Sequence, residues 1–330
     1  MSDKNTTFNS VGGSGAERDR QPSKADLYRE RLDIFVLTPL RVMWSDWRTR
    51  TGGLIILAYV FVGVVGVHLI EPAQTGGPRL IGPLQNMQYP LGTNNLGEGL
   101  LAKVVHATPP MLKMVVSGAV FSTALATVVG TVSGYKGGYT DTVLTTISDI
   151  AMTIPGLPLV ILFLVVFEPS NPFFIGVILS INAWAGLART IRSQVLELRD
   201  QSYIEASRIM DVSLHRIIVD DILPNIMPYV LISFVNTGRG VIFGSVALFY
   251  IGVLNVPFSN WGIMLNRAYS TGGALYSWSS LYWIITPMAA IVVLSLGLVL
   301  FSQGTERLFN PRIRARHAES IEETGPTTGD

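Results

Sequence analysis

The 330-residue chain contains no cysteine and few charged residues. Without cysteine it cannot form disulfides, thiolate metal sites, cysteine nucleophiles or palmitoylated thiols. Charged residues make up 14% of the chain, whereas soluble domains carry about 25%. The formal net charge of +1 gives no indication of nucleic-acid binding. These deficits argue against a soluble enzyme and favour a membrane protein.

Two kinds of catalytic motif are also missing. The four histidines are scattered and form no His-Glu-x-x-His motif or histidine–carboxylate cluster: His68, His106, His215 and His317. No Gly-x-x-x-x-Gly-Lys-Ser/Thr loop for nucleotide phosphates is present. We therefore expect no metal, no cofactor and no ATP hydrolysis in this chain itself.

Long apolar runs dominate what the chain does contain, with 48% hydrophobic residues and a mean hydropathy of +0.41. A membrane-spanning helix needs about 20 mostly apolar residues. Six such runs are present, and Pro155 predicts a kink in the third. We expect an all-α membrane protein with six transmembrane helices, at residues 52–70, 114–135, 142–167, 173–188, 226–251 and 281–301.

The segments that flank this transmembrane domain, residues 51–310, are more polar. Residues 1–30 are rich in Ser, Gly, Thr and charge, which predicts a disordered tail. Residues 31–50 place apolar side chains such as Leu32 and Trp47 at helical spacing between charges. This pattern favours an amphipathic helix on the membrane surface, with a short helix packed on a partner as the alternative. Residues 311–330 are expected to form a second tail.

Basic residues are distributed unevenly between the two sides. Six spans place both termini on one side, together with 19 of the 24 Lys and Arg residues. The opposite side carries only Arg79, Lys103 and Arg267. The positive-inside rule then predicts a multi-pass protein of the cell membrane with both termini and the 189–221 connection in the cytoplasm.

Residues 197–225 lie between the fourth and fifth expected spans. Ile204, Met210 and Leu214 alternate with charges at helical spacing, and Asp211 and Ser213 can end one short helix and begin another. Such an amphipathic projection suits a groove on another protein. From these residues alone, a helix folded back on the bundle is an equal alternative.

The order of residues in this segment resembles the coupling motif of ABC-importer permeases. That motif reads Glu-Ala-Ala, three residues, Gly, nine residues, an apolar residue, any residue and Leu-Pro. This chain has Glu205-Ala206-Ser207, Asp211 and Leu223-Pro224-Asn225. Further stretches are similar to the C-type permease of dipeptide and oligopeptide importers and their nickel and sugar relatives, namely residues 90–93 (PLGT), 134–141 (GYKGGYTD), 259–265 (SNWGIML) and 310–312 (NPR).

Three residues depart from the motif. Asp211 replaces its glycine, so a residue that adopts left-handed backbone less readily must form the turn, and Ser207 replaces the second alanine. Asp221 stands where this subfamily usually has histidine. The resemblance implies a type I importer permease in which this segment, the coupling segment, docks on an ATP-binding subunit. The implied docking residues, of which Glu205 is the principal one, are Glu205, Ala206, Ser207, Asp211, Leu223, Pro224 and Asn225.

The resemblance also implies an assembly. Its members are a second homologous permease, two ATP-binding subunits that bind ATP and Mg, an extracytoplasmic solute-binding protein and the lipid bilayer. This chain would form half of the path of an imported solute, which the resemblance makes a peptide or oligopeptide, with a sugar as the alternative.

Three polar residues within the expected spans are candidates for that path: Arg239, Asn236 and Asp149. An unpaired charge at the centre of a transmembrane helix costs about 2.5 to 3.5 kcal/mol, so Arg239 needs a partner or water. It can contact an anionic or hydroxyl-rich solute. The alternative is a structural ion pair with Asp149 or with an acid of the partner permease.

Two other classes of protein remain as alternatives. A stand-alone secondary transporter relies on paired intramembrane charges or broken-helix repeats, and here only Asp149 and Arg239 qualify. A membrane-embedded enzyme needs a nucleophile with a base, or a metal site, and the sequence displays neither.

Overall fold

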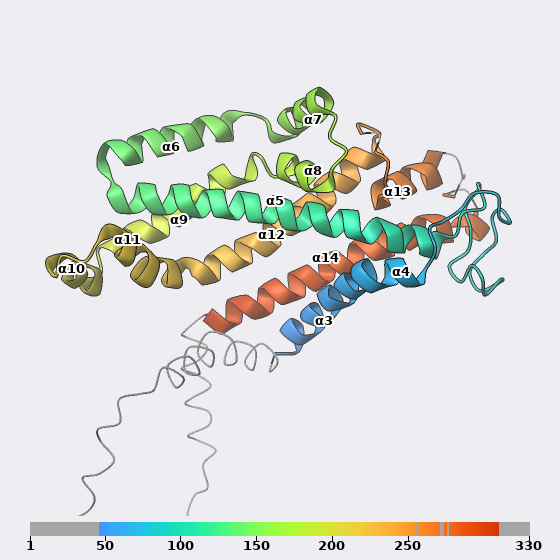
Figure 1. Ribbon diagram of the computed structural model, residues 1–330, viewed down its shortest axis with the longest axis horizontal. Coiled ribbons are helices and arrows are strands. Elements are labelled where there is room, and N and C mark those ends of the chain that lie inside the picture. Colours follow the sequence, from blue (N-terminus) through green and yellow to red (C-terminus); the bar gives the residue numbers. More distant parts are fainter. Residues whose placement is uncertain (1–45, 255, 271–273, 276, 310–330) are drawn as a thin grey trace, which may run out of the picture.

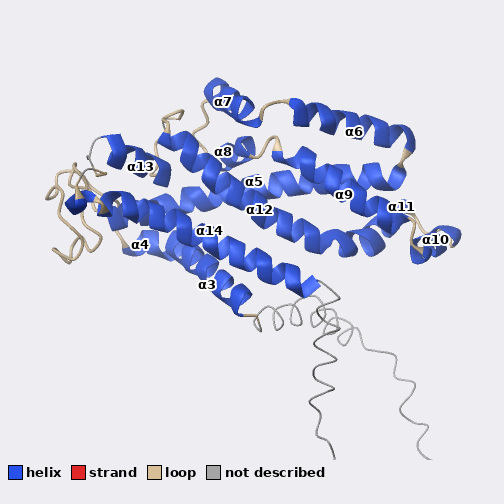
Figure 2. Cartoon of the chain, turned by 180° about the vertical axis from the view of Figure 1, so that it is seen from behind, coloured by secondary structure: helices blue, strands red, loops and turns tan. Residues whose placement is uncertain are grey.

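The computed structural model describes residues 46–254, 256–270, 274–275 and 277–309. The regular structure of these residues is helical, apart from one isolated bridge between Thr93 and Gly99 (Figures 1 and 2). The expected tails and residues 31–45 of the expected surface helix lie outside the described residues. Trp47, which was expected in that surface helix, is instead the first residue of the first described helix, α3.

The helices follow one another with short connections except in two places, residues 70–99 and 251–260. In chain order they are α3 (Trp47–Phe61), the π-helical turn η2 (Val62–Gly66), α4 (Val67–Leu69), α5 (Leu100–Lys136), α6 (Gly138–Thr153), α7 (Gly156–Phe167), α8 (Pro172–Leu179), α9 (Ala183–Arg199), α10 (Ser202–Ile209), α11 (Leu214–Arg216), the π-helical turn η3 (Ile217–Ile222), α12 (Leu223–Tyr250), α13 (Trp261–Ser270), the 3-10 turn η4 (Trp278–Ser280) and α14 (Tyr282–Phe309).

Four helical stretches of the described chain are long and apolar enough to cross a membrane. They are Trp47–Leu69, Leu100–Lys136, Leu214–Tyr250 and Tyr282–Thr305. Two pairs each pass the same test together but are bent at a break, α6 with α7 by 84° and α8 with α9 by 58°. The expected all-α membrane fold is confirmed, and six spans result when each bent pair counts as one.

Two helix bounds differ clearly from the expected spans. α5 begins at Leu100 rather than near 114, because it continues through Pro109 and Pro110. Transmembrane helices tolerate proline where neighbouring groups satisfy the freed carbonyls. The expected span 173–188 is two helices, since α8 ends at Leu179. The Ser180 hydroxyl, at this break, donates to the carbonyls of Gly176 and Val177.

α5 runs through the centre of the bundle, beside α8, α9 and α12 (Figure 1). Small residues allow the close contacts. A Cβ on Gly118 of α5 would lie 2.6 Å from the Gly176 carbonyl oxygen of α8. The same holds where α3 meets α14, since a Cβ on Gly52 would lie 2.6 Å from the Gly297 oxygen. Backbone-to-backbone packing of this kind is typical of helices in membranes.

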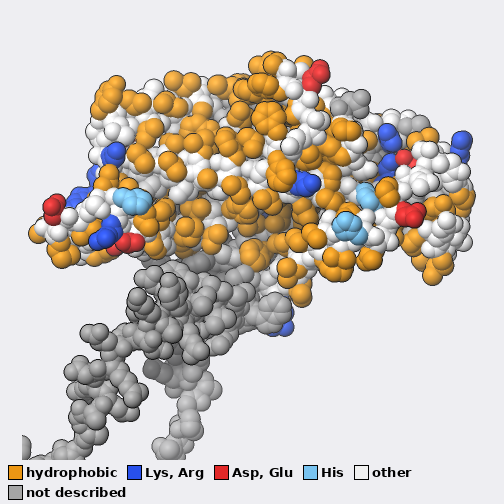
Figure 3. All heavy atoms as spheres, in the orientation of Figure 1, with side chains coloured by type: hydrophobic (Ala, Val, Ile, Leu, Met, Phe, Trp, Pro, Cys, Tyr) orange, Lys and Arg blue, Asp and Glu red, His pale blue; other side chains and the backbone are white. Residues whose placement is uncertain are grey.

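The bundle has two chemically distinct ends. α10 lies at one end, toward which the start of α3 and the end of α14 also point, and the 70–99 loop and α13 lie at the other (Figure 1). Charged side chains gather mainly toward these ends, and hydrophobic ones cover most of the surface between them (Figure 3). This distribution fits a bundle that crosses a bilayer along its long axis.

Glu98 fixes the 70–99 loop to two helices. Its buried carboxylate accepts hydrogen bonds from Asn94 (2.6 Å) and from Lys103 of α5 (2.7 Å), and lies 3.8 Å from Arg267 of α13. Burial raises the pKa of Glu98, but these hydrogen bonds and nearby cations outweigh it and hold the pKa below its ordinary value. The loop is therefore tied to α5 and α13 by a charged cluster.

Candidate functional site

α10 is the core of the coupling segment and is only partly packed on the bundle. Ile204 is fully buried in a cluster that includes Ile191 of α9 and Ile217 of η3. On the outer face Glu205 and Ala206 are exposed. Two large apolar residues at the tip are exposed as well, Ile209 by 81% and Met210 by 69%. One face of α10 thus anchors the segment and the other presents an acid beside apolar side chains.

The turn after α10 uses Asp211 in the left-handed conformation, with a φ of +56°. The Asp211 amide donates to the carbonyl of Arg208 (3.0 Å), and the Val212 amide donates to that of Ser207 (3.1 Å). This pair of bonds defines a Schellman motif, whose left-handed position is usually glycine. Asp211 therefore occupies the place of the motif's glycine with the backbone geometry that glycine favours.

Three contacts join α10 to the long helices. Ser207 donates to the Asp221 carboxylate of η3 (3.3 Å). Asn225 of α12 donates to the Tyr203 hydroxyl of α10 (3.4 Å). Arg208 donates from Nε to the hydroxyl of Tyr135 on α5 (3.2 Å) and lies over its ring. These contacts connect α10 to both α5 and α12.

Leu223, Pro224 and Asn225 form the first turn of α12, directly after η3. The proline has no amide hydrogen and its ring crowds the carbonyl four residues earlier, that of Asp220. A wider π-helical turn over Ile217–Ile222 coincides with this position. Asn225 also donates to the Asp221 carbonyl (2.6 Å). The Leu-Pro-Asn part of the motif thus lies where the π-helical turn η3 changes to the α-helix α12.

Asp149 lies on α6, where its carboxylate pairs with Arg189 of α9. Asp141, nearer the start of α6, makes a bidentate ion pair with Arg192 of α9. Arg192 donates from Nε and from a terminal nitrogen to the two Asp141 carboxylate oxygens, each at 2.5 Å. Both arginines and Asp149 line a cavity of about 270 Å³. The Asp149–Arg239 ion pair considered from the sequence is absent from the described structure, because Asp149 is engaged with α9.

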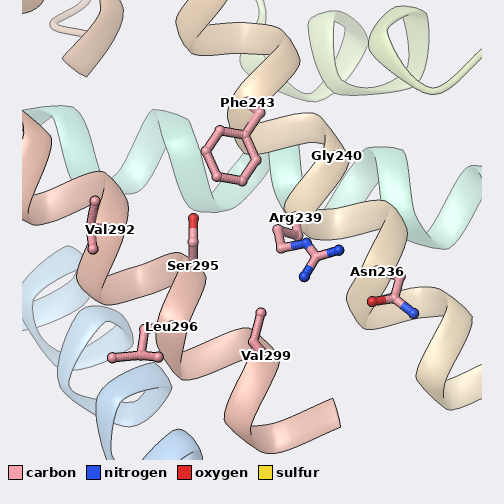
Figure 4. A pocket seen from close by; sticks show the side chains of 8 residues that line it. All are labelled: Asn236, Arg239, Gly240, Phe243, Val292, Ser295, Leu296 and Val299. Atoms are coloured by element: carbon pink, nitrogen blue, oxygen red, sulfur yellow. The ribbon is translucent and has the colours of Figure 1, made fainter. Parts of the chain in front are cut away.

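Arg239 and Asn236 instead share a different cavity, of about 530 Å³, between α12 and α14. Ser295 of α14 also lines it, together with an apolar wall that includes Phe243 and Leu296 (Figure 4). The structure therefore brings together two of the three expected path residues and separates the third. Sequence reasoning missed Ser295, because one serine within an apolar run carries no signal.

A bundle of membrane-spanning helices with an amphipathic projection at one end is the architecture expected of an importer-type permease. The family described as "Binding-protein-dependent transport system inner membrane component" matches residues 126–315. The chain belongs to this family, and the resemblance to ABC-importer permeases drawn from the coupling motif is confirmed.

Similar proteins carry consistent names. The chain is 29% identical to the oligopeptide transport system permease protein OppC of Bacillus subtilis over 68% of this chain and 72% of that one. It is 27% identical to the dipeptide transport system permease protein DppC of the same organism, covering 79% and 81%. It is also 27% identical to a putative peptide permease protein of Brucella suis, covering 80% and 87%. All three are named as permeases rather than as enzymes.

Proposed function

We propose that this chain is a permease subunit of an ATP-driven importer of peptides or oligopeptides and forms half of the translocation path. Family membership supports the transport role, and the names of the relatives support the solute class. The observation that carries the coupling role is the outer face of α10, where Glu205 and Ala206 lie beside exposed Ile209 and Met210. Such a face is complementary to an apolar groove with a basic rim on another protein.

The proposed assembly contains this chain, a second homologous permease, two ATP-binding subunits and an extracytoplasmic solute-binding protein, embedded in the lipid bilayer. The ATP-binding subunits hold ATP and Mg, and this chain hydrolyses no ATP. Closure of the ATPase pair moves α10, and the bonds of Tyr203, Ser207 and Arg208 transmit this movement to α12, η3 and α5, respectively.

We infer that the protein lies in the cell membrane with the α10 end in the cytoplasm. Both termini are then cytoplasmic, because the start of α3 and the end of α14 point toward that end (Figure 1). The excess of basic residues on this side supports the orientation. The 70–99 loop and α13 then face the solute-binding protein.

A charge reversal on α10 tests the coupling role. We expect Glu205→Lys to abolish ATP-dependent uptake in vesicles while the amount of protein in the membrane is unchanged. Glu168→Lys is the matched control, since Glu168 is an exposed acid directly after α7, outside both α10 and the 70–99 loop. Normal uptake by Glu205→Lys would refute the assignment.

Purification from the native membrane in mild detergent tests the assembly. Mass spectrometry should recover two ATP-binding chains, a second permease and a binding protein with the tagged chain. Recovery of the tagged chain alone, with ion-gradient uptake by the isolated protein, would instead establish a stand-alone secondary transporter.

A further inference from the structure

The cavity between α12 and α14 gathers polar groups at the depth of the membrane centre. Arg239 lies near the middle of α12 (Leu223–Tyr250), and Ser295 lies near the middle of the Tyr282–Thr305 span. Figure 4 shows Arg239 extending from α12 into the space that faces α14, with Asn236 on the same helix. The cavity volume of about 530 Å³ is far larger than one water molecule needs.

These polar groups lack partners within the described part of the chain. The Ser295 hydroxyl is buried and makes no hydrogen bond there. No ion pair or side-chain hydrogen bond is made among the described residues by Arg239 or Asn236. A guanidinium, an amide and a hydroxyl that line one largely apolar cavity are complementary to an anion with an adjacent hydrogen-bonding group.

The rest of the lining is apolar and unspecific. Five lining residues have no polar side-chain group: Gly240, Phe243, Val292, Leu296 and Val299. The Phe243 side chain is 53% exposed. Such a surface accepts side chains of varied shape. Peptides of different sequence share only their backbone amides and their terminal groups, so fixed polar contacts must be made to those.

We propose that this cavity is a carboxylate subsite for the transported peptide. Arg239 pairs with the terminal carboxylate, Ser295 donates a hydrogen bond to the same group, and Asn236 bonds to the neighbouring backbone amide. The proposal rests on the proposed peptide-import function and adds to it a means of recognition that is independent of peptide sequence. It also gives the mid-membrane charge of Arg239 a partner in each transport cycle.

The decisive experiment compares two probes in the complete transporter, reconstituted with its co-purified subunits, with ATP inside the vesicles and binding protein outside. The probes are tetra-alanine and its C-terminal amide, each at a concentration well below saturation. The measured quantity is the ratio of their initial uptake rates. The binding protein has its own preference for one probe, but this is the same for every permease variant and cancels when the ratios are compared.

We expect Arg239→Gln to lower the acid-to-amide ratio about tenfold or more, because a hydrogen-bonded charge pair is lost only for the free acid. Arg239→Lys should restore part of the ratio. Ser295→Ala should lower it about threefold, and this small substitution still reports on the subsite if the Arg239 variants fail to assemble. Lys113→Gln is the matched control, since Lys113 is also a mid-span cation but lies over the Phe173 ring of α8, outside this cavity. Its ratio should equal that of the wild type.

Two results would overturn the subsite. If Arg239→Gln reduces uptake of both probes equally, Arg239 pairs with an acid of the second permease instead. If Ser295→Ala also leaves the acid-to-amide ratio of uptake rates unchanged, the cavity does not bind the peptide carboxylate. Both results leave peptide import itself standing. Failure of the wild-type transporter to carry either probe would instead refute the proposed solute class.

Discussion

The guanidinium of Arg208 lies over the ring of Tyr135, with its carbon 4.9 Å from the ring centroid, and its Nε donates to the Tyr135 hydroxyl at 3.2 Å. The two residues join the end of α10 to the end of α5, the helix at the centre of the bundle. Since α5 also packs on α8, α9 and α12, this contact connects the proposed docking surface to most of the transmembrane domain.

Weakening this contact should uncouple ATP hydrolysis from transport. Tyr135→Phe removes the hydrogen bond, worth about 0.5 to 1.5 kcal/mol, and keeps the ring. Tyr135→Leu also removes the cation–π contact, worth about 0.5 to 1 kcal/mol. We expect the ATP consumed per peptide transported to rise slightly in the first variant and several-fold in the second. The control is Tyr139→Leu, because Tyr139 is 84% exposed, and a wild-type ratio in Tyr135→Leu would contradict the prediction.

Replacing Asp211 with glycine should stabilise the turn after α10. A left-handed conformation costs a non-glycine residue about 1 to 2 kcal/mol, less for Asp, and the greater unfolded-chain entropy of glycine offsets part of the gain. The net gain of about 0.5 to 1 kcal/mol should slow hydrogen exchange of the Asp211 and Val212 amides about two- to fivefold. Asp211→Val should accelerate exchange, since a β-branched residue suits this φ poorly. Faster exchange in the glycine variant would show that the Asp side chain stabilises the turn.

Adjacent glycines on α3 should respond differently to the same substitution. A Cβ on Gly52 would lie 2.5 Å from the Phe301 amide nitrogen of α14, whereas a Cβ on Gly53 meets only the edge of the Phe301 ring, at 3.9 Å. Gly52→Ala should destabilise the protein by about 1 to 3 kcal/mol, because two backbones must separate. Gly53→Ala should be neutral or slightly stabilising. Thermal unfolding in detergent measures both, and equal midpoints would mean that α3 does not pack on α14 this closely.

The Glu98 cluster predicts a pH dependence of stability. The folded pKa of Glu98 lies below its ordinary value of 4.5, so the ionised carboxylate stabilises the folded state. That contribution is fully present above about pH 5 and is lost as pH falls through the lower, folded pKa. Glu98→Gln should therefore destabilise the protein by about 1 to 3 kcal/mol at pH 7 and by less at pH 4.

The measurement is the unfolding temperature of wild type and Glu98→Gln across this pH range. Glu168→Gln is the control, since Glu168 is exposed and makes no ion pair among the described residues. A difference between Glu98→Gln and wild type that does not shrink at low pH would show that the neutral amide disturbs packing rather than charge.

The sequence predicted the helical class and the break at Pro155, because both depend on local composition and backbone preference. The left-handed turn at Asp211 was implied by the resemblance to the coupling motif, which has glycine at that position. It did not predict that α5 continues through Pro109 and Pro110, since helix neighbours decide whether a proline ends a helix. The Asp141–Arg192 pair joins residues 51 positions apart and depends on how α6 lies against α9. The polar cavity depends likewise on the rotation of α14 about its axis, which puts Ser295 in the wall of the cavity that Arg239 also lines. Periodicity within one apolar run does not determine that rotation.

The π-helical turn η3 directly precedes α12, so a change in the helix direction at η3 would displace the rest of α12 sideways. Arg239 lies 16 residues beyond Leu223, which corresponds to about 24 Å along the helix axis at 1.5 Å per residue. A tilt of about 10° around this turn would move the Arg239 backbone sideways by about 4 Å. A small rotation at the docking surface would thereby become a displacement of several ångströms at mid-membrane. Such a displacement is enough to widen or close the gap that separates α12 from α14.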